Sequence, residues 1–134
     1  MADAPLVAVI LDATRAYDRL IIGGIAQFVR ERTATGRGAG PWSLYVEEDP
    51  LQKLPDLASW HGHGIIANYD DRRVATALAK TDLPIVGVGG GFGWYEPATG
   101  IPYIYTDNAA IGRLGAEHLL GCGLRTLAFY GYPR

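Results

Sequence analysis

The sequence predicts an α/β fold, in which a doubly wound, mostly parallel sheet carries helices on both faces. Two observations support this fold. Short aliphatic runs such as Leu6–Leu11 are typical of strands that are buried on both faces of a parallel sheet. Segments with helical spacing of apolar residues alternate with these runs through short connections. We expect a strand order of roughly 2-1-3-4-5, with the later strands outermost.

The first half of the chain alternates predicted strands with predicted helices. The strands are Leu6–Leu11, Trp42–Val46 and Gly64–Ala67. The segment Tyr17–Arg32 is predicted to be a helix, because Ile21, Ile25, Phe28 and Val29 recur at helical spacing. Its acidic start at Asp18 and basic end suit the helix dipole. A weaker, proline-interrupted helix is predicted over Leu51–Trp60.

The second half repeats the alternation. Helices are predicted over Asp70–Lys80 and Ala109–Leu120, and in the latter we expect Ile111, Leu114 and Leu119 to face inward. The Asp70-Asp71 pair is most simply a helix N-terminus, where negative charge is favoured. Strands are predicted over Pro84–Val88, Tyr103–Thr106 and Leu127–Tyr130.

Composition limits the possible partners. The 134 residues fit one domain, and the net charge of −2 lacks the basic excess expected of a nucleic-acid-binding surface. No apolar run approaches the roughly 20 residues that span a bilayer, and the N-terminus lacks a basic signal-peptide region. The single Cys122 is expected to be a small buried residue in a reducing compartment. These features predict a cytoplasmic protein with no membrane partner.

Enzyme and cofactor motifs are poorly matched. The glycine run from Gly87 to Gly93 has no register for the G-x-G-x-x-G motif at the required place. His61 and His63 lack further ligands at metal-site spacing, and are most simply solvated loop residues. Ser43 and Ser59 do not lie in a nucleophile elbow. We therefore predict a binding module without catalytic residues, cofactor or metal.

Polar side chains follow several predicted strands. Ligands of open α/β sheets bind beyond the carboxyl ends of the strands. The segments at these ends are Asp12–Asp18, Asn68–Asp71, Gly89–Glu96 and Asp107-Asn108. Asp12, Tyr17 and Asp18 follow the first strand, and Asp107-Asn108 follows the fifth. Carboxylates and amides there suit the hydroxyls of a small neutral ligand, on which Phe92, Trp94 and Tyr95 could stack. The alternative is that Asp18 and Asn108 merely cap helices, and the pattern favours neither.

Several segments resemble the LacI-type, periplasmic-binding-protein-like sensor domains, and more narrowly the family of xylose operon regulators. They are 13–19, 46–49, 64–71, 84–90, 106–123 and 128–131, which together extend over nearly the whole chain. The family pairs a two-lobed LacI-like sensor with an AraC-type DNA-binding domain. The resemblance implies that residues 1–134 form the N-terminal lobe of a type I periplasmic-binding-protein-like sensor. The second lobe and the DNA-binding domain would lie outside this chain.

The resemblance also implies a function and a site. The function is sensing of a monosaccharide effector, xylose or a related sugar, by a homodimeric transcription regulator that binds operator DNA through another domain. The implied ligand-binding residues are Ala13, Tyr17, Asp18, Asn68, Gly89, Gly90, Gly91 and Asp107. Asn68 departs from the family pattern, which has an acidic residue there. A transporter's periplasmic sugar-binding protein and an α/β enzyme are the alternatives.

Overall fold

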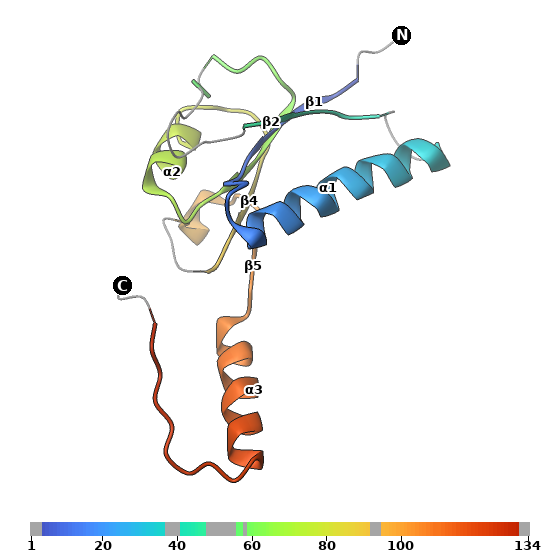
Figure 1. Ribbon diagram of the computed structural model, residues 1–134. Helices are drawn as coiled ribbons and strands as arrows, with labels where there is room; N and C mark the ends of the chain where they lie inside the picture. Colours follow the sequence, from blue (N-terminus) through green and yellow to red (C-terminus); the bar gives the residue numbers. More distant parts are fainter. Residues whose placement is uncertain (1–3, 37–40, 48–55, 58, 92–94, 132–134) are drawn as a thin grey trace.

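The computed structural model describes residues 4–36, 41–47, 56–57, 59–91 and 95–131, and its centre is a parallel five-stranded sheet (Figure 1). The strand order is β2-β1-β3-β4-β5. Every pairing of neighbours is parallel. The α/β class and the order of these five strands are therefore as predicted. The strands are β1 (Leu6–Ile10), β2 (Ser43–Val46), β3 (Gly64–Asn68), β4 (Ile85–Gly89) and β5 (Tyr103–Tyr105).

Two helices cover opposite faces of the sheet because side chains alternate along β1. Ala8 and Ile10 belong to a core cluster with α2 (Arg72–Leu78), which contributes Val74 and Leu78. Val9 and Leu11 point the other way, where three isoleucines of α1 (Ala16–Thr35) pack on them. A strand buried on both faces needs apolar residues at every position, so the unbroken aliphatic run of β1 is explained.

The ends of the helices follow local sequence signals. Gly36 ends α1 in the left-handed conformation, with φ of 62°. Asp71 accepts a hydrogen bond from the Arg73 amide at 2.7 Å and so caps α2, as the acidic pair predicts. A short 3₁₀ helix, η1 (Pro97–Thr99), precedes β5. No helix in the described part of the chain is both long and apolar enough to cross a membrane.

The last helix, α3 (Asn108–Gly121), differs from the prediction in its packing. It forms where expected, but Ile111 and Leu114 are 56% and 69% exposed instead of facing a core. Figure 1 shows α3 extending away from the sheet beyond β5. An amphipathic pattern predicts that one face of a helix is buried, but it does not identify the segment or chain that buries it. Cys122, just after α3, is exposed rather than buried.

The strand predicted over Leu127–Tyr130 is wrong. These residues have no strand partner, and Phe129 and Tyr130 are 95% and 100% exposed. In the predicted order this strand would lie beyond β5, but α3 leads the chain away from that edge (Figure 1). Residues 51–55 and 58 of the weak predicted helix lie outside the described residues. Asp56, Leu57, Ser59 and Trp60 are not helical.

Candidate functional site

A hollow lies at the carboxyl ends of β1 and β3, where α/β sheets bind ligands. Its volume is about 180 Å³. Three carboxylates and one guanidinium line it together with an amide and two aliphatic side chains. We call it the carboxyl-edge hollow, and it is formed by Ile10, Asp12, Arg15, Asn68, Asp70, Asp71 and Val74. Most of these residues come from the turns that follow the two central strands.

Beside this hollow, a buried hydrogen-bond network joins the first turn of α1 to β3. Asp18 is fully buried, and its Oδ2 accepts from the Asp12 amide at 2.9 Å. The same oxygen accepts from Asn68 Nδ2 at 3.4 Å. Asn68 Oδ1 in turn accepts from the Asp70 amide at 2.7 Å. Asn68 therefore positions both Asp18 and the backbone of Asp70.

The turn between β1 and α1 is held by its own polar groups. Asp12 Oδ1 accepts from the Thr14 amide at 2.9 Å, and the Asp12 carbonyl accepts from the Arg15 amide at 3.0 Å. Arg19 Nη1 donates to the carbonyls of Ala13 and Thr14, at 3.0 and 2.7 Å. These bonds fix the backbone from which Arg15 extends to the carboxyl-edge hollow.

The turn after β4 is contacted by residues from three other segments. Tyr17 Oη donates to the Gly89 carbonyl at 3.3 Å, and the Gly90 amide donates to Asp70 Oδ2 at 2.9 Å. Asn108, at the start of α3, donates from Nδ2 to the Gly90 carbonyl. The glycine turn is therefore a junction between the hollow, the first turn of α1 and α3.

Two of these glycines are required by geometry. A Cβ at Gly89 would lie 2.4 Å from Tyr103 Oη and 2.6 Å from Asp70 Oδ1, closer than real contacts permit. Gly91 has a φ of +76°, which side chains rarely adopt. The Gly91 amide donates to Tyr103 Oη at 3.3 Å. The glycine run thus serves close backbone approach to Asp70 and Tyr103.

An aromatic cluster supports Tyr103. Its ring stacks on Tyr95, with centroids 4.2 Å apart, and on Tyr105 at 5.4 Å. Tyr69 meets both Tyr95 and Tyr103 edge-on. The Tyr95 hydroxyl donates to the Ile101 carbonyl at 2.8 Å, so this residue is committed to packing. Phe92 and Trp94, the other aromatic residues that could stack on a ligand, lie outside the described residues.

The two neighbouring carboxylates of the hollow differ electrostatically. Burial raises the pKa of Asp70, while the Gly90 amide and the charge of Arg15 oppose that rise. The hydrogen bond from the Arg73 side chain lowers the pKa of Asp71, and Arg73 Nη2 lies 2.9 Å from Asp71 Oδ2. Asp70 is therefore a partly buried acid, whereas Asp71 is a paired helix cap.

The structure brings most of the predicted site residues to one place. Tyr17, Asp18, Asn68 and the Gly89–Gly90 backbone lie on or beside the carboxyl-edge hollow, with Ala13 and Gly91 in the flanking turns. Asp107 is exposed, and its Oδ1 accepts from the Ala110 amide at 2.8 Å as the cap of α3.

The predicted ligand-binding residues do not include Arg15, Asp70 or Tyr103, although the segments that hold Arg15 and Asp70 are predicted to follow strands at this edge. The Asp70-Asp71 pair predicts a helix start, yet only Asp71 caps α2. A signal was available for Asp70, because it follows a buried strand directly and therefore stands at the ligand-binding edge. No comparable signal marks Tyr103, which lies within β5 and acts through its hydroxyl.

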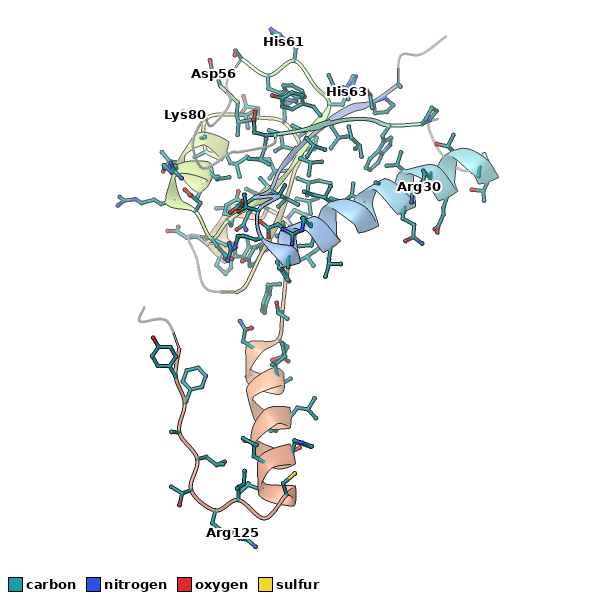
Figure 2. All side chains as sticks on the ribbon, in the orientation of Figure 1. Arg30, Asp56, His61, His63, Lys80 and Arg125 are labelled. Carbon is teal, nitrogen blue, oxygen red and sulfur yellow. The ribbon has the colours of Figure 1, made fainter. Side chains whose placement is uncertain are left out.

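The histidine pair lies far from this edge. Figure 2 shows His61 and His63 at the opposite end of the sheet from α3. His63 Nδ1 accepts from the Leu6 amide at 3.0 Å, which gives this side chain a structural role. Among the residues that the structure describes, no group of three or more His, Cys, Asp or Glu side chains is arranged to hold a metal ion.

Comparisons with known proteins agree with one another. The family model described as XylR N-terminal domain matches residues 6–109. The xylose operon regulatory protein of Escherichia coli strain K12 is 34% identical over 127 residues, which are 95% of this chain and 31% of that protein. Its counterpart in Haemophilus influenzae is 30% identical over 125 residues, which are 93% of this chain and 31% of that protein.

A solved structure gives the same result. It is described as the xylose-binding transcription activator xylR, and it matches with a TM-score of 0.76 and 32% identity. The match covers 98% of this chain and 31% of the solved chain. The present chain therefore spans about a third of the length of the relatives that it matches.

Proposed function

Because this chain belongs to the XylR N-terminal domain family, we propose that it senses a monosaccharide, most simply xylose, for a transcription regulator. Its relatives are regulators of a xylose operon, and the related solved structure is described as xylose-binding. Their names support sugar sensing, and the site supplies the chemistry for it.

One observation carries the proposal, namely the polar lining of the carboxyl-edge hollow. Asp12, Asn68 and Asp70 provide oxygen acceptors there, while Arg15 and the Asn68 amide provide donors. A sugar hydroxyl both donates and accepts, so it can pair with neighbouring groups of either kind. Asp18 is buried beside the hollow, and its role is to hold Asn68 and the Asp12 backbone.

The predicted residues take specific roles in this proposal. Asn68 lines the sugar site, and Tyr17 and the turns that hold Ala13 and Gly89–Gly91 flank it. Asp18 holds Asn68 and the Asp12 backbone in place. Asp107 acts indirectly, because its carboxylate caps the helix whose first residue, Asn108, contacts Gly90.

The rest of the protein enters the proposal as follows. Residues 1–134 form one lobe of a two-lobed sensor, and the sugar bridges it to a second lobe. A sugar that binds the closed arrangement more tightly than the open one shifts the population toward closure. Closure then reorients a DNA-binding domain, outside this chain, within a cytoplasmic homodimer. No catalytic step is required of the site.

Calorimetry on the intact protein that carries this chain tests the proposal. D-xylose, D-ribose, L-arabinose and D-glucose are titrated in turn, with sugar-dependent retention of promoter DNA as a second readout. We expect at least one neutral sugar to bind with one site per chain and to change DNA retention. Binding of none of them would overturn the proposal. The matched control Asp82→Asn alters an exposed carboxylate just before β4, at the other end of the sheet, and should leave sugar binding unchanged.

A further inference from the structure

We infer that the carboxyl-edge hollow selects uncharged ligands, and that the charge of Asp70 excludes sugar acids and sugar phosphates from it. This inference rests on the proposed function, since it names the ligand class of the same site. It follows from comparing how each charge around the hollow is compensated.

Two of the three carboxylates are engaged at close range. Asp71 Oδ1 accepts from the Arg73 amide at 2.7 Å and from Arg73 Nε at 3.3 Å, and Asp71 Oδ2 pairs with Arg73 Nη2 at 2.9 Å. The charge of Asp71 is thus largely compensated by Arg73. Asp12 bonds to Thr14 within its own turn through Oδ1.

Asp70 is compensated less than Asp71, because no guanidinium among the described residues pairs with it at close range. Its Oδ2 accepts from the Gly90 amide at 2.9 Å, and the neutral Tyr103 hydroxyl interacts with the same carboxyl group. Its Oδ1 is buried and meets no donor at full hydrogen-bond geometry among the described residues. Within the described part of the chain, Arg73 forms an ion pair with Asp71, and no ion pair is found for Asp70. Arg15 contributes a favourable charge from the rim of the hollow. Asp70 therefore leaves negative charge at a partly buried place, where salt screens it weakly.

This distribution of charge favours neutral polyols over anions. A hydroxyl can donate to an acidic lining and accept from Arg15, so a neutral sugar satisfies both. A carboxylate or phosphate at neutral pH offers acceptors and brings a like charge toward Asp70. Arg15 alone would attract an anion, but it shares the hollow with Asp12 and Asp70, and neither carboxylate has an ion-pair partner within the described part of the chain. The balance is against anionic ligands.

The test measures, in the intact protein, the ratio of the affinity for D-xylose to the affinity for an anionic analogue of D-xylose. D-xylose, D-xylonate and D-xylose 5-phosphate are titrated by calorimetry at pH 7.5. We expect both anions to bind at least about tenfold more weakly than D-xylose. In Asp70→Asn the ratio should narrow toward one, because the amide has a similar shape and no charge. In Asp82→Asn, which removes a charge away from the hollow, the ratio should not change.

A second variant keeps the test decisive if Asp70→Asn fails to fold. Arg15→Gln changes an exposed side chain and removes the positive charge at the rim, so rejection of the anions should increase. An unchanged or smaller ratio in Arg15→Gln would overturn the inference. So would anions that bind wild-type protein within threefold of D-xylose, or an Asp70→Asn variant that keeps the wild-type ratio. Those results leave the proposed function standing, whereas failure of every neutral sugar to bind overturns both.

Discussion

Asn68 donates a hydrogen bond to Asp18 across 50 residues of sequence, with 3.4 Å between Asn68 Nδ2 and Asp18 Oδ2. The bond joins the end of β3 to the first turn of α1. Because Asn68 Oδ1 also accepts from the Asp70 amide, a single side chain sets the relative positions of two carboxylates. The hydrogen bonds of the Asn68 side-chain amide thus fix the geometry of the candidate site.

Asn68→Ala should therefore destabilise the fold. The substitution leaves the buried Asp18 carboxylate with one fewer donor and removes the acceptor for the Asp70 amide. Buried groups that lose a partner cost about 1–3 kcal/mol. Urea unfolding at pH 7 measures the change. Gln27→Ala, which removes an exposed amide that bonds to Glu31, should cost less than about 0.5 kcal/mol. Equal losses in the two variants would show that the buried network contributes nothing.

Asp70 and Asp71 should give stability changes of opposite sign with pH. Burial raises the pKa of Asp70 above its ordinary value of 3.8, so the folded chain loses stability as pH rises through the folded pKa. The amide side chain introduced by Asp70→Asn cannot ionise. The free energy of unfolding of this variant minus that of wild type should therefore be more positive at pH 7 than at pH 3.5, which means that the variant gains stability relative to wild type as pH rises. Urea unfolding at both pH values measures this difference.

Asp71→Asn is the matched comparison. Arg73 lowers the pKa of Asp71, so its stabilisation is present above pH 3.8 and is lost as pH falls through the folded pKa. The free energy of unfolding of Asp71→Asn minus that of wild type should therefore be more negative at pH 7 than at pH 3.5, which means that the variant loses stability relative to wild type as pH rises. If both variants shift in the same direction, the two carboxylates do not differ as their environments indicate.

Gly89→Ala should disturb the site and the fold together. The added methyl would meet Tyr103 Oη and Asp70 Oδ1 below contact distance, and neighbouring groups would have to move. Overpacking of this kind costs about 1–3 kcal/mol, which thermal unfolding detects as a lower Tm. The control is Gly24→Ala in α1, where a Cβ meets nothing within 4 Å. That variant should gain about 0.5–1 kcal/mol, and a Tm loss like that of Gly89→Ala would contradict the steric argument.

The exposed face of α3 should cause residues 1–134 to self-associate when they are expressed alone. Ile111, Leu114 and Leu119, the face predicted to be buried, are each more than two-fifths exposed, and apolar surface of this kind is usually covered. Sedimentation velocity at increasing concentration should show species larger than a monomer. Leu114→Glu should shift the distribution toward monomer, whereas Glu117→Gln on the same helix should not. A strictly monomeric wild type would contradict the prediction.

Local patterns account for most of the sheet. The aliphatic runs at β1, β3 and β4 and the spacing of apolar residues in α1 locate these elements to within a few residues. The same patterns fail after β5. The run Leu127–Tyr130 has the composition of a strand, yet a strand exists only where a partner lies beside it, and its residues are exposed.

The candidate site divides in the same way. The sequence alone determined which turns meet, because parallel strands deliver their carboxyl ends to one edge, and it placed Tyr17, Asp18, Asn68 and the glycine turn there. Only the tertiary structure decided what each polar group does at that edge. Asp18 forms hydrogen bonds within the protein, and Asp107 caps α3. Asp70 lines the hollow, and its charge is incompletely compensated. A carboxylate's role depends on which donors reach it, and here those donors come from residues up to 50 positions away.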